Sequence, residues 1–467
     1  MRYREIRHGT ESVASALLKL YRPDASSEWG LPRYDGAQLS PGTLYLEDIS
    51  SIPGVLRVEG IEHYQLRMRL LAGTGDFLLT TLPLEASYEE YNREYLGLGS
   101  PRLVLARAAG VAPIQVVRSC LNDPAALAQL VRAAREGLLR RLCPYVGTRD
   151  AWVLARVLSE LSGTPVQVVA PSPNLSQAAN RKSFFTELAR LALGEDSVPD
   201  TIVARGVDAL TDSVREMARR CDMLALKMDS HASSTGNLIL DVRRVARMSR
   251  GAVREAVCLF LGEAAWDGRE AVCVVRWHRD VRFSPSVQVW IPPRGEPVVD
   301  GVFFQRLTGA TRVFAGSMPM TPSCRFYRQL ADGSFVLAGV LQRLGFVGRC
   351  SFDAVVCADS RLKFVECNGR WGGTSLPMAL MKRLFPQGAM YAAGDVHAPE
   401  LAGARFPALL ERCRADLYDA RTGRGRCVLY NAGALKARGK YSAISISRVP
   451  EPVGRETRET EKLFTQR

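Results

Sequence analysis

Residues 351–373, SFDAVVCADSRLKFVECNGRWGG, decide the fold of this chain. Two runs that alternate apolar and polar residues flank the turn at 358–361, which predicts an antiparallel β-hairpin. Pairing about the middle of this turn places Asp353 directly opposite Glu366, and Asn368 lies two residues further along the same face. Two carboxylates that face each other repel, so the pattern favours a cation between them. A ligand set of oxygen atoms, without Cys or His, favours Mg²⁺ over Zn²⁺.

The same hairpin could instead be a solvent-exposed sheet edge that carries ordinary surface charges. The neighbouring residues Phe352, Ala354, Phe364 and Val365 are apolar and predict burial, which makes this alternative the weaker one. Carboxyl groups on opposite faces of the sheet would exclude the metal site.

The composition is that of a soluble globular protein. A chain of 467 residues predicts about three domains at roughly 150 residues each. The hydrophobic fraction of 47% and the charged fraction of 24% are ordinary values. No apolar run approaches the roughly 18 residues of a membrane span, and the N-terminus MRYREIRHGT lacks the apolar segment of a secretory signal. We therefore expect a cytoplasmic protein with no membrane partner.

Several classes of site are disfavoured by the remaining composition. The 11 cysteines contain no C-x-x-C pair and predict reduced core residues, and the 5 histidines show no metal-binding spacing. The net charge of +14 is spread along the chain, and the densest basic run, at 421–426, lacks aromatic residues on which bases could stack. Specific nucleic-acid binding is therefore disfavoured, whereas small molecules that carry phosphate are favoured.

Lysine is scarce in this chain, which makes its positions informative. Lysine and arginine total 62, yet between Lys19 and Lys363 the only lysines are Lys182 and Lys227. An isolated lysine in such a chain indicates a place that needs a compact ammonium group. Small residues follow Lys227 in the loop KMDSHASSTGN, where backbone N–H groups could approach phosphate oxygens. A flexible surface loop would have the same composition, so the loop alone decides nothing.

The patterns divide the chain into four segments: a turn-rich N-terminal extension over 1–75, a small α/β domain over 76–175, a larger block over 176–380, and a β-containing C-terminal cap with a charged tail over 381–467. Helices are predicted over 123–142 and 148–163, with Asp123 and Thr148 as N-caps and Gly163 as the stop. A further helix is predicted over 176–194.

The ordered set of Lys182, Lys227 with its loop, Asp353 and the run ECNGRWGG at 366–373 resembles the ATP-grasp superfamily of carboxylate–amine ligases. The resemblance covers about 180–380, and it is greatest to stand-alone peptide ligases of natural-product pathways. It implies a mixed α/β and α+β fold. A pre-ATP-grasp α/β domain would precede a two-lobed ATP-grasp core, with an N-terminal extension and a C-terminal appendage.

The resemblance also implies roles for single residues. ATP would be held by Lys182 and Lys227 at its α- and β-phosphates, and by the loop residues Ser233, Ser234 and Gly236 at its β- and γ-phosphates. The Mg²⁺ ligands, for two ions with Mn²⁺ as a substitute, would be Asp353, Glu366 and Asn368. The adenine hinge fits less well: Gln288 stands where the family has an acid, Ile291 follows it in the hinge, and Glu296 lies one residue beyond the expected ribose-binding position.

The implied reaction begins with attack of a substrate carboxylate on the γ-phosphate of ATP, which gives an acyl phosphate that an amine then attacks. Arg370 or Arg349 would stabilise the oxyanion of the second step. The expected substrates are an amino acid or peptide and an amine, and a homodimer is compatible with the sequence. Two alternatives stay open: a kinase that phosphorylates a hydroxyl group, and a nucleotide-binding scaffold without activity.

Overall fold

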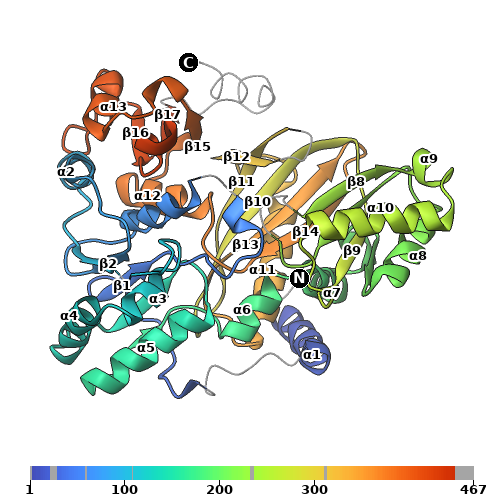
Figure 1. Ribbon diagram of the computed structural model, residues 1–467, viewed down its shortest axis with the longest axis horizontal. Coiled ribbons are helices and arrows are strands. Elements are labelled where there is room, and N and C mark those ends of the chain that lie inside the picture. Colours follow the sequence, from blue (N-terminus) through green and yellow to red (C-terminus); the bar gives the residue numbers. More distant parts are fainter. Residues whose placement is uncertain are drawn as a thin grey trace.

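The computed structural model describes residues 3–21, 29–57, 60–107, 109–231, 236–309 and 313–447. They form three sheets with helices packed against them (Figure 1). The helices are α1 (Tyr3–Tyr21), η2 (Val55–Arg57), η3 (Ile61–Leu70), α2 (Ala86–Glu94), α3 (Val116–Leu121), α4 (Pro124–Arg135), α5 (Arg149–Ser162), α6 (Pro173–Ala179), α7 (Lys182–Leu193), η4 (Glu195–Ser197), α8 (Val207–Met217), α9 (Val242–Val245), α10 (Arg250–Glu263), α11 (Tyr327–Arg343), α12 (Ser375–Leu384), η5 (Pro399–Leu401), α13 (Phe406–Cys413) and α14 (Leu435–Arg438). Within these ranges, no helix is long and apolar enough to cross a membrane.

The first domain is built on a parallel sheet of order β3-β2-β1-β4-β5. Its strands are β1 (Thr43–Leu46), β2 (Phe77–Thr80), β3 (Arg102–Leu105), β4 (Arg141–Pro144) and β5 (Gln167–Val168). Every residue of β1, β2 and β4 is buried, as is usual where helices cover both faces of a parallel sheet. The central strand β1 comes from the segment predicted as an extension over 1–75, so part of that segment belongs to this domain.

The predicted N-cap residues and the predicted stop residue of the helices in this domain are confirmed. Asp123 accepts hydrogen bonds from the backbone N–H groups of Ala125 and Ala126, and Thr148 caps α5 in the same way. Gly163 ends α5 in the left-handed conformation, at φ 72°. The helix predicted over 123–142 is too long: α4 ends at Arg135, and the chain turns through Gly137 into β4.

A second, smaller lobe contains an antiparallel sheet of order β6-β9-β7-β8, covered by α8 and α10 (Figure 1). Its strands are β6 (Thr201–Ala204), β7 (Met223–Met228), β8 (Asn237–Asp241) and β9 (Val272–Arg276). Lys227 lies on β7. Ser233 and Ser234, which precede β8, lie outside the described residues.

The largest sheet has the order β14-β13-β10-β11-β12-β15-β17-β16. Its strands are β10 (Val281–Ile291), β11 (Val298–Thr308), β12 (Val313–Pro319), β13 (Gly348–Cys357), β14 (Leu362–Asn368), β15 (Met390–His397), β16 (Cys427–Asn431) and β17 (Lys440–Ser447). Helices α7 and α11 pack near β14 and β10, and α1 packs against both helices. Strands β15, β16 and β17 come from the predicted C-terminal cap over 381–467, and they extend this sheet through the pairing of β12 with β15.

The decisive hairpin is formed by β13 and β14, and Asp353 pairs directly with Glu366 as predicted. The turn differs from the prediction, because Cys357 N–H donates to Arg361 and Ser360 adopts a φ of 69°. The loop therefore has one more residue than a two-residue turn. A bulge with Val365 as its extra residue restores the predicted register before Glu366.

Candidate functional site

A cavity of about 490 Å³ lies where the three sheets meet. The small lobe contributes Lys227 from β7 and Val275 from β9, the large sheet contributes the hairpin residues, and the first domain contributes Tyr64 and Arg67. Strand β15 closes the other side with Asp395. The cavity is in the size range of small-molecule sites, about 300–1,000 Å³.

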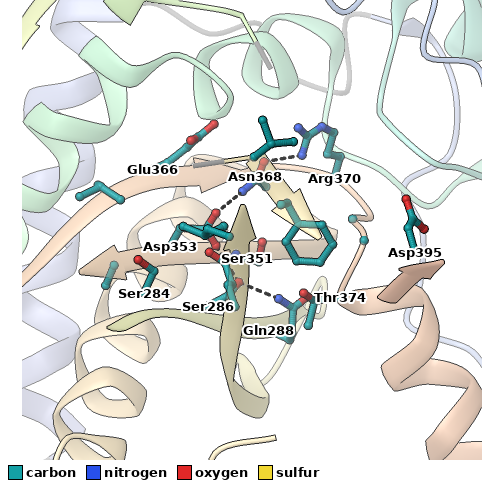
Figure 2. A pocket seen from close by; sticks show the side chains of 18 of the residues that line it. Ser284, Ser286, Gln288, Ser351, Asp353, Glu366, Asn368, Arg370, Thr374 and Asp395 are labelled. Carbon is teal, nitrogen blue, oxygen red and sulfur yellow. Dashed lines mark hydrogen bonds between the residues drawn. The ribbon is translucent and has the colours of Figure 1, made fainter. Parts of the chain in front are cut away.

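One wall of the cavity carries Asp353, Glu366, Asn368 and Arg370 (Figure 2). Ser286 Oγ donates to Asp353 Oδ1 at 2.6 Å, and Asn368 Nδ2 donates to Asp353 Oδ2 at 3.0 Å. Arg370 in turn donates to Asn368 Oδ1 at 2.5 Å. The predicted metal ligands are therefore brought together on one face of the hairpin.

The two carboxyl groups on this wall interact electrostatically. Burial and the neighbouring charge of Glu366 raise the pKa of Asp353 to about 6, although Ser286 and Arg370 oppose the shift. A bound cation would remove this repulsion, because it favours the charged form of both groups. Two carboxylates and an amide oxygen are donors that suit Mg²⁺. Among the described residues, no group of three His, Cys, Asp or Glu side chains could hold a metal ion instead.

The same repulsion makes a stability prediction for Asp353→Asn. A carboxyl group with a pKa of about 6 when folded and about 3.9 when unfolded destabilises the fold once it ionises. In chelator-treated buffer, stability should fall as pH rises from about 4 to about 6, and Asp353→Asn should remove this dependence. Because the side chain is only half-buried, we expect a gain of about 1–2 kcal/mol at pH 7 from urea unfolding. Exposed Asp332→Asn is the control, and loss of stability in Asp353→Asn would contradict the repulsion.

Lys182 and Lys227 lie close enough for their charges to interact. Lys182, at the first position of α7, donates from Nζ to the His231 carbonyl oxygen at 2.9 Å. Burial and the charge of Lys182 lower the pKa of Lys227, whereas Glu366 opposes this shift. Lys227 lines the cavity, with its Nζ 5.4 Å from the centre of the Trp277 ring. Two neighbouring ammonium groups favour an anion between them.

Lys182 is fixed in position by a buried acid at the end of β7. Asp229 accepts hydrogen bonds from Ser183 N at 2.7 Å and from Ser183 Oγ at 2.8 Å, and its carbonyl oxygen accepts one from Lys182 N at 3.0 Å. These contacts tie the start of α7 to the strand that carries Lys227. The helix predicted over 176–194 is interrupted just before this point, because α6 ends at Ala179 and α7 begins at Lys182.

Gly236 lies at the start of β8, where its carbonyl oxygen accepts a hydrogen bond from Met228 N at 2.9 Å. A Cβ atom at this position would lie 2.8 Å from the Met228 side chain, so the close approach of the two strands requires glycine. Gly236 is not among the residues that line the cavity, whereas its neighbour Asn237 is.

The residues predicted for the adenine hinge are separated in the structure. Gln288 lines the cavity and donates from Nε2 to Ser286 Oγ at 3.0 Å. Ile291 is fully buried in the core, and Glu296 is exposed in the loop after β10. The chain instead crosses from the small lobe to the large sheet between β9 and β10, and Trp277 and His278 line the cavity there.

The two predicted catalytic arginines occupy different environments. Arg370 lines the cavity, and its backbone forms a bridge with Val146 of the first domain. Arg349 is paired with Asp300, and its guanidinium lies between the rings of Trp290 and Trp371, at 5.4 Å and 5.2 Å from their centres. Arg349 is not among the cavity-lining residues, and it contacts the segment that carries Arg370 through the Trp371 ring.

Arg349 is therefore expected to stabilise the fold through these contacts. Arg349→Ala removes a buried ion pair and two cation–π contacts, although Asp300 keeps its contact with Lys382. We expect a loss of about 2–4 kcal/mol in the free energy of unfolding, measured with urea. The matched control is Arg361→Ala, which breaks an exposed pair with Asp359 and should cost less than about 1 kcal/mol. Equal losses in both variants would refute the buried role of Arg349.

The sequence prediction missed the half of the cavity that lies away from Lys227. Its polar residues include Tyr64, Arg67, Asp395 and Lys440, and its apolar residues include Ile52. They come from three segments far apart in the chain, and no short motif connects them. The scarcity of lysine, which singled out Lys182 and Lys227, does not single out Lys440, because other lysines also follow Lys363 in the chain.

Comparison with known proteins supports the fold. The family model of the pre-ATP-grasp domain matches residues 65–160. No curated protein matches the chain. Among solved structures, the N5-carboxyaminoimidazole synthetase of Staphylococcus aureus, complexed with ADP, is similar with a TM-score of 0.53 at 9% identity, covering 93% of this chain and 100% of that chain.

Two biotin carboxylases are similar to about the same degree. The biotin carboxylase domain of the 2-oxoglutarate carboxylase of Hydrogenobacter thermophilus, in complex with MgADP and bicarbonate, has a TM-score of 0.51 at 11% identity, covering 88% of this chain and 87% of that one. A β,γ-ATP complex of Campylobacter jejuni biotin carboxylase has a TM-score of 0.52 at 9% identity, with 88% of each chain covered. The predicted mixed α/β and α+β fold is thus confirmed: residues 65–160 match the pre-ATP-grasp domain, and the chain as a whole shares the fold of these synthetase and carboxylase structures.

Proposed function

We propose that this protein is an ATP-dependent ligase that joins a carboxylate to an amine and releases ADP and phosphate. The carboxylate belongs to an amino acid or peptide, and the product to a peptide natural-product pathway. The observation that carries the proposal is the cavity itself. An acidic wall with Asp353 and Glu366 and a cationic side with Lys227 line one cavity, which suits a polyphosphate and its metal ion.

ATP fits the end of the cavity next to the small lobe. The similar structures contain ADP, MgADP or β,γ-ATP. We assign the adenine hinge to the crossing between β9 and β10, where Trp277 and His278 line the cavity, in place of Ile291 and Glu296. Lys182 and Lys227 would neutralise the phosphates, and the residues around Ser233 and Ser234 would cover them.

The acidic wall would hold Mg²⁺ through Asp353, Glu366 and Asn368, with two ions as the resemblance implies. Bound there, Mg²⁺ would neutralise charge on the transferring phosphoryl group. Ser286 and Gln288 orient this wall, because Gln288 holds the Ser286 hydroxyl that donates to Asp353. These two polar residues therefore keep the Asp353 carboxylate directed along the hairpin face.

Arg370 is the residue assigned to the reacting carboxylate. In the first step, a carboxylate oxygen bonds to the γ-phosphorus as the bond to ADP breaks. In the second step, the amine bonds to the acyl carbon, phosphate leaves, and the amine loses a proton. The Arg370 guanidinium can bind the carboxylate first and the oxyanion later, because it lies beside the Asn368 end of the metal wall.

An ADP-release screen tests this function. Pairs of amino acids and short peptides are incubated with the full chain and MgATP, and products are weighed by mass spectrometry. We expect ADP release with one class of pair, together with a product lighter by one water than the sum of its substrates. ADP release with a product heavier by a phosphoryl group would show a kinase instead, and absence of ADP release from every pair would refute the ligase.

A further inference from the structure

The half of the cavity that lies away from Lys227, and that contains Tyr64 and Asp395, has an aliphatic wall. Most of this wall comes from one turn-rich segment of the chain. Ile52 N–H donates to the Ile49 carbonyl at 3.0 Å, and Val55 N–H donates to the Ile52 carbonyl at 3.3 Å. Hydrogen bonds from residue i+3 to residue i align side chains three positions apart, so Ile49, Ile52 and Val55 share one face. All three line the cavity together with Ile61. Together these aliphatic side chains form one continuous apolar surface beside the polar residues Tyr64 and Asp395, which suits contact with an aliphatic group of a ligand.

An acid stands on the other side of this half, at Asp395 of β15. Its Oδ2 is 2.7 Å from Lys440 Nζ and accepts from Tyr64 Oη at 3.3 Å, whereas its Oδ1 accepts from Ser442 Oγ at 2.7 Å. An ionised carboxylate has about four acceptor positions, so Oδ1 can accept a further donor. Burial raises the pKa of Asp395, but Lys440 and the hydrogen bonds outweigh burial and keep the pKa below its usual value.

The cations around Asp395 differ in how far they are already neutralised. Arg67 lies against the buried carboxylate of Glu47, with Nε 3.3 Å from Glu47 Oε2. Arg370 instead hydrogen bonds to the neutral amide of Asn368, which leaves its charge available for an anion. Figure 2 shows Asp395 on a strand separate from the hairpin, on the side of the cavity where Arg370 lies.

We propose that the carboxylate substrate is an aliphatic α-amino acid with a free ammonium group. Its carboxylate lies at Arg370, its ammonium donates to Asp395 Oδ1, and its side chain packs against Ile49, Ile52 and Val55. This inference rests on the proposed function, because it identifies the carboxylate that is activated. It gives each of the three chemical features of the amino acid its own partner.

Ligand analogues test the ammonium contact in the unchanged protein. L-leucine and 4-methylpentanoate share the carboxylate and the aliphatic chain, and only leucine carries the ammonium. By titration calorimetry of the full chain with MgADP, we expect leucine to bind at least about 10-fold more tightly. Equal affinity for the two ligands, or no binding of leucine, would overturn the proposal.

Asp395→Asn then tests which residue makes that distinction. The variant should lose the preference for leucine over 4-methylpentanoate, while the affinity for 4-methylpentanoate changes little. A general structural defect would lower both affinities together, so the ratio reports the ammonium contact itself. A preference that survives in Asp395→Asn overturns the assignment of this residue.

Ile52→Ser tests the aliphatic wall. Ile52 is half-buried, so the substitution opens no closed core cavity, and it should weaken leucine about 10-fold while alanine changes little. Leu259→Ser, at a side chain that is 65% exposed on α10, is the matched control and should bind leucine as the parent does. Equal weakening of leucine and alanine would contradict the wall.

The binding results also separate this inference from the proposed function. ADP release with other carboxylates, without binding of leucine, would leave the ligase standing and overturn the aliphatic substrate. The expected binding pattern without any ADP-forming turnover would instead overturn the ligase and, with it, the activation of the bound amino acid.

Discussion

Glu366→Gln is expected to reduce ADP formation by at least about 1,000-fold, because it removes one of two carboxylates that would hold Mg²⁺. The substitution keeps the size of the side chain and leaves the strand pairing with Asp353 in place. It also removes the charge that raises the pKa of Asp353. The metal-free variant should therefore unfold at the same urea concentration as the parent or at a higher one. A coupled ADP assay and urea unfolding measure the two effects.

The control for this variant is Glu255→Gln, at an exposed position on α10. It should leave both ADP formation and stability unchanged. Retained turnover in Glu366→Gln would remove this residue from the metal site. A large loss of stability would show that Glu366 supports the fold, and the activity loss would then say nothing about metal binding.

Arg370→Ala is expected to lower kcat by about 100- to 1,000-fold, which is the usual effect of removing a donor that stabilises an oxyanion. Nucleotide binding should change little, because the assigned adenine hinge and the lysines lie in the small lobe and at α7. Steady-state turnover and calorimetry with MgADP measure the two quantities. A variant that loses MgADP binding as strongly as turnover would place Arg370 at the nucleotide rather than at the acyl group.

Arg370→Lys provides the matched comparison. Lysine keeps the charge but lacks the planar fork that binds a carboxylate through two parallel hydrogen bonds. We expect it to recover only part of the lost kcat. Full recovery would show that charge alone is needed at this position.

The acidic wall of the site could be predicted from the sequence, because its residues lie close together in the chain. Asp353, Glu366 and Asn368 lie within one hairpin, and the alternation of side chains fixes their common face. The predicted register was correct for Asp353 although the turn was not, because the longer loop and the bulge at Val365 offset each other. The alternation of apolar and polar residues along the strands does not reveal a loop residue in the left-handed conformation, and it does not reveal a bulge.

The other features depend on contacts between distant segments. The family pattern predicted the adenine hinge at Gln288, Ile291 and Glu296, whereas we assign it to the connection of the lobes between β9 and β10, a feature of sheet topology that the sequence does not reveal. Likewise, Asp395 meets Tyr64 only because β15 joins the large sheet beside the first domain. Strand β1 was hidden within a turn-rich segment, since its four residues are too short for a clear period.

Transfer of an oxygen label tests the proposed chemistry most directly. A carboxylate substrate from the ADP-release screen, labelled with ¹⁸O in both carboxylate oxygens, is ligated with unlabelled MgATP. Attack of that carboxylate on the γ-phosphate predicts one ¹⁸O in the released phosphate and one in the amide product. Released phosphate without ¹⁸O would contradict the acyl phosphate and the ligase mechanism proposed for this site.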